Sequence, residues 1–187
     1  MGRLLYSTLA SLDGYIADAD GRFDWAAPSE EVHAAVNQRL HGVGTFLLGR
    51  RTYEVFAEHW PNASEEEQVV AIPLNTMPKY VASRTLREPL EWENSTLLTG
   101  DVAQAVTALK QEDGGDLLLI GSTQLLHTLI EQNLLDALRL MIDPLVLGGG
   151  KRMFPEDGAL RQFRLIHSEP TTTGAILTTY AIAEPAT

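Results

Sequence analysis

Short apolar runs alternate with helical segments along most of the chain, and this alternation limits the fold more than any other feature. Runs typical of buried strands lie at 3–10, 45–48, 79–83, 96–99, 116–120 and 138–143. Helical patterns lie at 29–40, 52–59, 64–75, 101–110 and 122–132. In alternating units of this kind, a helix returns the chain to the start of the next strand. The pattern therefore predicts a mostly parallel central sheet with helices on both faces.

The end of the chain breaks this alternation. Two extended segments, 163–168 and 175–182, follow each other with no helix between them, which is typical of an antiparallel pair. No repeat, linker or low-complexity tract divides the chain, and 187 residues suit one domain with its own core. We therefore expect a single α/β domain over residues 1–187, with antiparallel C-terminal strands.

Composition narrows the classes of ligand. The 25 acidic residues exceed the 14 basic residues, and the net charge of −11 argues against binding to a nucleic-acid backbone. The lack of cysteine excludes disulfides, thiolate zinc sites and cysteine nucleophiles. The five histidines lack metal-ligand spacing, so no metal site is expected. No apolar run approaches the about 18 residues that span a bilayer, and we expect a cytoplasmic protein with a small-molecule ligand.

Three apolar runs end in a glycine turn, at 46–52, 118–123 and 147–150. In open α/β sheets, ligands bind beyond the carboxyl ends of the strands, where helix N-termini offer free N–H groups to anions. Glycine lets the backbone approach a pyrophosphate closely. The predicted phosphate-binding residues are Gly49, Arg50, Arg51, Thr52, Gly121, Ser122, Thr123, Gly148 and Gly149. Each turn, taken alone, is equally compatible with an ordinary connection.

A fourth segment, Ser83-Arg84-Thr85, ends the run at 79–83 with two hydroxyls and a guanidinium. Such groups suit a monoester phosphate, for instance the 2′-phosphate that distinguishes NADPH from NADH. The alternative is again a simple turn. The GxGxxG fingerprint is absent, which disfavours an ordinary Rossmann domain.

Several of these segments together resemble a known family. Residues 11–17 (SLDGYIA) resemble the SLDGxIA signature of the RibD C-terminal family, and 48–53 (LGRRTY) resembles a GRxTxE turn that this family shares with the dihydrofolate reductases. Segments 83–85, 120–122 and 144–150 follow in the family's order. The resemblance implies a dihydrofolate reductase-like fold, NADPH bound at the glycine and Ser83-Arg84 turns, hydride transfer from its nicotinamide, and a homodimer.

Two carboxylates are candidates on the substrate side. Asp13 lies between the first strand and the following loop, where it could position the substrate or take part in proton delivery. Residues 25–30 resemble the Trp-x-x-Pro-x-Asp/Glu segment of dihydrofolate reductases, which gives Glu30 a similar catalytic role. A turn-forming Asp-Gly pair and a first-turn carboxylate that complements the helix dipole are the alternatives. Trp25, Tyr53 and Phe56 are candidates for an apolar wall beside a flat ring, or for the core.

The resemblance also bears on the substrate. Riboflavin reductases of the family carry a lysine four residues before the signature serine and a basic residue after its Asp-Gly, where this chain has Ser7 and Tyr15. The arginine that grips folate in dihydrofolate reductases is replaced by Met77-Pro78. We therefore expect an NADPH-dependent reductase of a C=N or C=O bond in a small ring-bearing substrate. The alternatives are 5-amino-6-(5-phosphoribosylamino)uracil reductase of riboflavin biosynthesis and a nucleotide-binding protein without turnover.

Overall fold

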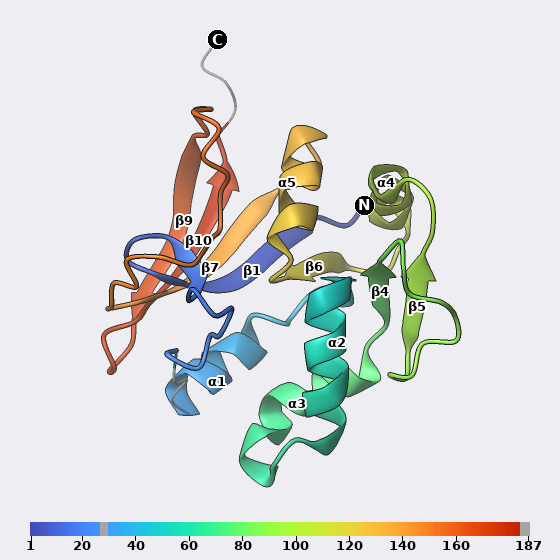
Figure 1. Cartoon of the computed structure of the whole chain (residues 1–187), viewed down its shortest axis with the longest axis horizontal. Helices are drawn as coiled ribbons and strands as arrows, with labels where there is room; N and C mark the ends of the chain where they lie inside the picture. The colour runs from blue at the N-terminus through green and yellow to red at the C-terminus, as the bar shows by residue number, and fades with distance from the viewer. Residues whose placement is uncertain (27–29, 184–187) are drawn as a thin grey trace.

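The computed structural model describes residues 1–26 and 30–183, and it contains an eight-stranded sheet in the order β5-β4-β3-β6-β1-β7-β10-β9 (Figure 1). The strands are β1 (Leu4–Ser11), β3 (Val43–Gly49), β4 (Lys79–Ala82), β5 (Ser95–Leu98), β6 (Asp116–Ile120), β7 (Ala137–Asp143), β9 (Phe163–Pro170) and β10 (Ile176–Ile182). The strands from β5 to β7 are parallel, and β10 pairs antiparallel with both β7 and β9. The predicted mostly parallel sheet with antiparallel C-terminal strands is confirmed.

Helices cover both faces of the sheet, as predicted (Figure 1). One face carries α4 (Val102–Gln111) and α5 (Thr123–Glu131). The other, called here the α1–α3 face, carries α1 (Glu30–Gln38), α2 (Arg50–His59) and α3 (Gln68–Thr76), with short 3-10 turns at Trp60–Asn62 and Glu65–Glu67. Two separate apolar clusters result, one on each face.

Alternation along β1 divides its side chains between these clusters. Leu4 and Tyr6 are buried with Val106 of α4 on one face, whereas Leu5 is buried with Leu74 of α3 on the other. Successive side chains of a strand point to opposite faces, so a strand covered on both sides reads as a continuous apolar run. This is why the N-terminal run at 3–10 predicted a central strand correctly.

One small element was not predicted. The segment expected as a loop after β1 contains β2 (Tyr15–Ala17), which pairs antiparallel with β8 (Lys151–Arg152). The two strands approach closely because Gly150 precedes β8: its φ is 125°, and a Cβ there would lie 2.1 Å from the Ala17 carbonyl oxygen. Strands of two and three residues are too short to show a period in the sequence.

Local capping explains where some helices begin. Asp101 precedes α4, and its carboxylate accepts hydrogen bonds from the backbone N–H groups of Ala103 and Gln104. Ser29, where the helical pattern at 29–40 begins and the sequence places an N-cap, lies outside the described residues. Across residues 1–26 and 30–183, no helix is long and apolar enough to cross a membrane, and no group of three or more His, Asp or Glu side chains is placed to hold a metal ion.

Candidate functional site

Two helices from opposite faces begin side by side at the carboxyl ends of β3 and β6. The hydroxyl of Ser122 accepts a hydrogen bond from the Gly49 N–H at 2.8 Å and lies 2.8 Å from Thr52 Oγ1. One side chain therefore joins the start of α5 to the start of α2. The first N–H groups of a helix have no partner within it, and the helix dipole is positive there. The paired helix starts form a site suited to an anion.

The predicted glycines Gly49 and Gly121 are required by this junction itself. A Cβ on Gly49 would lie 2.8 Å from Ser122 Oγ, and a Cβ on Gly121 would lie 3.1 Å from Thr52 Oγ1. Gly121 also has a φ of 60°, a left-handed conformation that side chains disfavour. A larger residue at either position would disturb the protein before any ligand binds.

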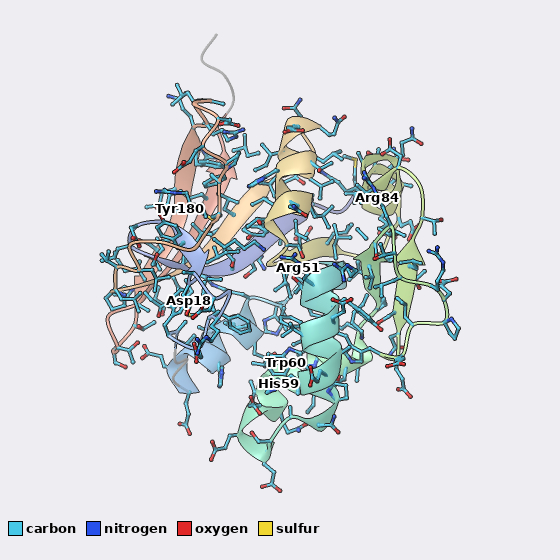
Figure 2. All side chains as sticks on the ribbon, in the orientation of Figure 1. Asp18, Arg51, His59, Trp60, Arg84 and Tyr180 are labelled. Carbon is cyan, nitrogen blue, oxygen red and sulfur yellow. The ribbon has the colours of Figure 1, made fainter. Side chains whose placement is uncertain are left out.

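The arginines that open α2 differ in their surroundings. Arg50 is paired on the surface with Glu54, with 3.0 Å between Nη1 and Oε1. Arg51 is exposed and lies where α2 begins (Figure 2). Burial and, next, the charge of Arg51 lower the pKa of Lys151 in β8, so these two cations share one edge. No ion pair of the described residues includes Arg51, so it can act on an anion at the helix starts, and Lys151 adds a second positive charge at this edge.

The Ser83-Arg84-Thr85 segment forms a turn directly after β4, next to β3 in the sheet. The Ser83 hydroxyl accepts hydrogen bonds from the backbone N–H groups of Thr85 at 3.2 Å and Leu86 at 3.1 Å. Arg84 is exposed (Figure 2). The turn and the helix starts therefore lie along the carboxyl edge, the name used here for the ends of β4, β3, β6, β1 and β7.

Asp13 joins the signature turn to the glycine turn before β8. Its Oδ1 accepts from the Ser11 hydroxyl at 2.6 Å and the Leu147 N–H at 3.2 Å, and its Oδ2 accepts from the Gly148 N–H at 2.8 Å. These bonds, that from Ser11 above all, hold the pKa of Asp13 below its usual value. Asp13 is therefore an ionised carboxylate that fixes the turn containing Gly148 and Gly149.

The start of α1 is held by a residue that the sequence did not single out. Glu31 accepts hydrogen bonds from the N–H and hydroxyl of Thr172, in the loop between β9 and β10, and these bonds lower its pKa. Glu30, the predicted residue, is exposed at the first position of α1. Trp25 is half-buried just before it, and its Nε1 donates to the Arg22 carbonyl at 3.1 Å.

Tyr53 and Phe56 lie in a different environment from Trp25. Tyr53 is 5% exposed, and its hydroxyl accepts a hydrogen bond from the Trp92 N–H at 3.1 Å. Phe56 packs edge-on against Trp60 with 5.9 Å between ring centroids. In the part of the chain that the structure describes, neither ring contacts Trp25. The structure does not bring the three predicted wall residues together, and their role toward a substrate stays a prediction.

The α1–α3 face leaves part of the central strands uncovered. Ser7 and Leu9 of β1 point to this face, like the buried Leu5, yet both are only half-buried. Arg139 and Met141 of the neighbouring β7 are half-buried on the same face. Central strands of a sheet with helices on both faces are normally covered. These four residues, called the floor, form a solvent-accessible surface that runs up to the carboxyl edge.

Asp143 ends β7 beside this floor and was missed in the sequence. Its Cα is paired with that of Ser11, and it points to the same face as Met141. Its Oδ2 is buried and has no hydrogen-bond partner within the described residues. Burial raises its pKa. The sequence of the run 138–143 does not indicate a role for Asp143. Whether its carboxylate has a hydrogen-bond partner depends on residues that only the fold brings near it.

An open cavity of about 950 Å³ lies elsewhere, between α2 and the loop from β4 to β5. Tyr53, Glu54, Leu86 and Trp92 are among its lining residues. It includes none of the residues of the floor and none of the predicted phosphate-binding residues, so we do not assign it to the site.

The model of the RibD C-terminal domain family matches residues 3–177 of this chain. The uncharacterized protein YyaP of Bacillus subtilis (strain 168) is 26% identical over 181 residues, which cover 95% of this chain and 94% of YyaP. A solved protein of Shewanella sp. PV-4, provisionally assigned to riboflavin biosynthesis, is similar with a TM-score of 0.75 and 24% identity, over 97% of this chain and 99% of that protein.

The fold also matches a dihydrofolate reductase. The enzyme from Enterococcus faecalis, solved in complex with NADP(H) and RAB-propyl, has a TM-score of 0.66 and 14% identity, over 98% of each chain. Identities this low establish the fold alone. The dihydrofolate reductase-like fold implied by the sequence motifs is confirmed.

Proposed function

The chain belongs to the RibD C-terminal domain family, and from this premise we propose that it is an NADPH-dependent reductase that transfers hydride to a C=N or C=O carbon of a small ring-bearing substrate. The observation that carries the proposal is the junction of α2 and α5, where Ser122 joins two helix starts at the carboxyl edge. An NADP(H) complex of a protein with the same fold supports the choice of cofactor.

The residues at the carboxyl edge fit the parts of NADPH in order. The strand order β4-β3-β6-β1 sets the Ser83-Arg84 turn, the two helix starts and the signature turn in one row. We assign the 2′-phosphate to Ser83 and Arg84, and the pyrophosphate to the N–H groups that follow Gly49 and Gly121, with Arg51 adding charge. When bound, the nicotinamide supplies the hydride. The half-buried Leu9 gives an apolar surface at the end of this row.

Catalysis then depends on positioning and on a proton for the substrate heteroatom. The hydrogen bonds of Asp13 suit the positioning role, because its carboxylate is ionised and holds the Gly148 turn. Glu30 remains a candidate at the start of α1. Asp143 is better suited than Asp13 to donate a proton, since burial favours its neutral form. In this scheme Asp143 protonates the heteroatom as hydride reaches the carbon, and solvent then restores its proton.

Cofactor binding tests the proposal. NADPH should bind at least about tenfold tighter than NADH, a difference of about 1.4 kcal/mol, and Arg84→Ala should abolish most of this preference. Arg87→Ala is the matched control, because Arg87 is exposed in the same loop and, among the described residues, donates only to the Leu86 carbonyl. Fluorescence titration measures both affinities. Equal binding of the two cofactors to the native protein would contradict the 2′-phosphate assignment.

Two alternatives differ in what they predict for turnover. Riboflavin-pathway reduction of an aminopyrimidine is supported by the similar Shewanella protein, whereas Ser7 on the floor stands where such reductases carry lysine. A nucleotide-binding protein without turnover would keep the carboxyl edge alone. A substrate screen that follows NADPH oxidation separates them: oxidation with the aminopyrimidine selects the first alternative, and tight NADPH binding with no oxidation by any C=N or C=O compound selects the second.

We also propose a homodimer formed through β9. This strand ends the sheet, and its side chains are exposed along nearly its whole length, including Leu165 at 49% and Ile166 at 55%. An open strand edge with exposed apolar residues readily pairs with a second copy. Light scattering should give twice the chain mass of 20.5 kDa, and Ile166→Lys should shift the protein toward monomer. A native monomer at micromolar concentration would refute the dimer.

A further inference from the structure

Two arginines from distant parts of the chain come together at the floor. Arg39 follows α1, and Arg139 lies in the middle of β7. Arg139 Nη1 donates a hydrogen bond to the Arg39 carbonyl oxygen, which brings the two residues together. Both side chains are half-buried. Arg139 points to the α1–α3 face, as Ala137 and Met141 do, because side chains alternate along a strand.

Neither arginine has an anionic partner within residues 1–26 and 30–183. None of the ion pairs in this part of the chain includes Arg39 or Arg139. Arg39 Nη2 is buried and forms no hydrogen bond there. Buried charges in proteins are nearly always paired, because removing them from water without a partner is energetically costly.

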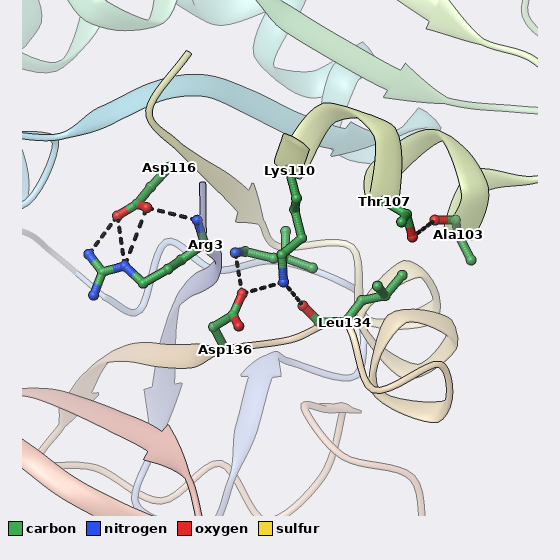
Figure 3. Close-up of polar contacts among 8 residues, drawn as sticks. Arg3, Ala103, Thr107, Lys110, Asp116, Leu134 and Asp136 are labelled. Atoms are coloured by element: carbon green, nitrogen blue, oxygen red, sulfur yellow. Dashed lines mark hydrogen bonds and ion pairs between the residues drawn. The ribbon is translucent and has the colours of Figure 1, made fainter. Parts of the chain in front are cut away.

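Two carboxylates act electrostatically on these arginines, but neither forms an ion pair with them. Asp116 acts electrostatically on Arg139, but both of its oxygens are held by Arg3, with 2.6 Å between Oδ2 and Arg3 Nη2 (Figure 3). Glu169 acts on Arg39 from the exposed strand β9, without forming an ion pair with it. Within the described residues, both arginines therefore lack an ion pair that would neutralise them directly, in a chain whose net charge is −11.

Each guanidinium group lies near another positive charge. Burial and, next, the charge of Arg139 lower the pKa of Arg39, whereas burial and, next, the charge of Arg3 lower the pKa of Arg139. Arginine nevertheless keeps its proton in proteins, so the repulsion cannot be relieved by deprotonation. It can be relieved by an anion that accepts hydrogen bonds from both forks, as planar carboxylate and phosphate groups do.

The position of the pair relates it to the substrate side. The Cα of Arg139 is paired with that of Ser7, and both residues belong to the floor. Arg139 lies four positions before Asp143, which ends β7 at the carboxyl edge. We propose that Arg39 and Arg139 bind a carboxylate or phosphate group of the substrate, at the end of the floor away from the cofactor. That the anion belongs to the substrate rests on the proposed function, whereas anion binding itself does not.

This assignment narrows the substrate class. A ring compound that carries an anionic substituent is held at both ends, by the arginine pair at one and by the hydride donor at the other. A neutral ring of the same shape lacks the first contact and leaves two half-buried charges unpaired. The arginines therefore select among ring compounds as well as increasing affinity.

Thermal melts with simple probes test the inference without turnover. Benzoate and inorganic phosphate are compared at constant ionic strength with benzamide, a neutral ring of similar shape. We expect at least one anion, but not benzamide, to raise the melting temperature, and which anion does so identifies carboxylate or phosphate as the bound group. Arg39→Gln should weaken this binding at least about tenfold. Arg87→Gln is the matched control, since Arg87 is exposed in the loop between β4 and β5, outside the floor.

The variants also separate ligand binding from a structural role. Without any probe, Arg39→Gln should melt at or above the native temperature, because it removes an unpaired buried charge and keeps the carbonyl that Arg139 contacts. Arg39→Lys keeps the charge and should retain part of the anion effect. Stabilisation that is absent for both anions, or equal in Arg39→Gln and the native protein, overturns the proposal. A lower dimer fraction in Arg39→Gln, with no anion effect in the native protein, also overturns it and indicates that the partner subunit supplies the anion.

The experiments distinguish a failure of the proposed arginine site from a failure of the proposed reductase function. Anion-dependent melts require neither NADPH nor a substrate, and in the proposed scheme NADPH contacts neither Arg39 nor Arg139. Anion binding without any preference for NADPH would leave the arginine site standing and refute the reductase. The reverse result would keep the reductase and refute the arginine site.

Discussion

The carboxyl edge and the floor are built in opposite ways. At the edge, the polar groups of the helix starts and of the signature turn are paired: Ser122 joins two helix starts, and Asp13 holds the Gly148 turn. Beside the floor, Asp143 and Arg39 each bury a polar atom that has no hydrogen-bond partner in the described chain. Paired groups fix a site before a ligand arrives, whereas unpaired groups are completed by one. In the proposed function, the edge is therefore a preformed cofactor site and the floor is the part that distinguishes substrates.

Replacing Asp143 should give the largest effect. Asp143→Asn removes the proposed proton donor and should lower turnover by about 10²–10⁴-fold, while NADPH affinity stays unchanged. In the native protein, turnover should fall as pH rises through the raised pKa of Asp143, because only the protonated acid can donate. Steady-state rates over a pH series measure both effects.

Glu30→Gln is the comparison for this variant, since Glu30 is an exposed carboxylate at the start of α1. If Asp143 supplies the proton, Glu30→Gln should keep turnover within a few-fold of the native rate. A large loss in Glu30→Gln with normal rates in Asp143→Asn would move the acid to α1, as the sequence alone suggested.

A smaller effect is expected when the helix junction is weakened. Ser122→Ala leaves the Gly49 N–H without its acceptor, which should cost about 1–3 kcal/mol of stability and weaken NADPH binding about tenfold. Ser64→Ala is the control, because Ser64 also accepts a backbone hydrogen bond, in a capping box distant from the edge. Melts and NADPH titrations on both variants test this. Unchanged NADPH affinity in Ser122→Ala would show that the junction only stabilises the fold.

The smallest effect is expected for Asp13→Asn and concerns the stability of the protein at acidic pH. Its pKa is lowered by hydrogen bonds in the folded protein, so the stability it contributes is present above about pH 4, the unfolded value, and is lost as pH falls through the lower folded value. Asp13→Asn should therefore reduce the acid sensitivity of the melting temperature below about pH 4. Parallel curves for the native and Asn proteins would mean that the Gly148 turn is held by other contacts.

The edge was predictable from the sequence to a greater degree than the floor, for a physical reason. Gly49 and Gly121 each lie between an apolar strand and a helix, so the neighbouring residues alone were enough to predict a glycine turn at both positions. The strands themselves were predicted because burial on both faces demands continuous apolar runs. The junction through Ser122 could be anticipated only as a turn, since its partners lie 70 or more positions away.

Asp143, Arg39 and Arg139 carry no such local signal. Each is a single charged residue within or next to an otherwise ordinary strand or helix. Their shared location depends on the register between β1 and β7 and on where α1 crosses the sheet, which are long-range properties. The sequence also cannot show that Arg39 and Arg139 lack an ion-pair partner, because every carboxylate is a possible partner until the fold is known.

The central position of β1 has a consequence for how the chain folds. Although β1 is made first, both of its neighbours come late, since β6 begins at Asp116 and β7 at Ala137. Parallel pairing between such distant segments is slow, and apolar strands without partners are prone to aggregate. During most of translation, β1 therefore has no strand partner, and Leu4 and Leu5 stay unburied. A nascent chain that stops before β6 leaves β1 without either neighbour and separate from β3, so β1 can join the sheet only after residues 116–120 have been made.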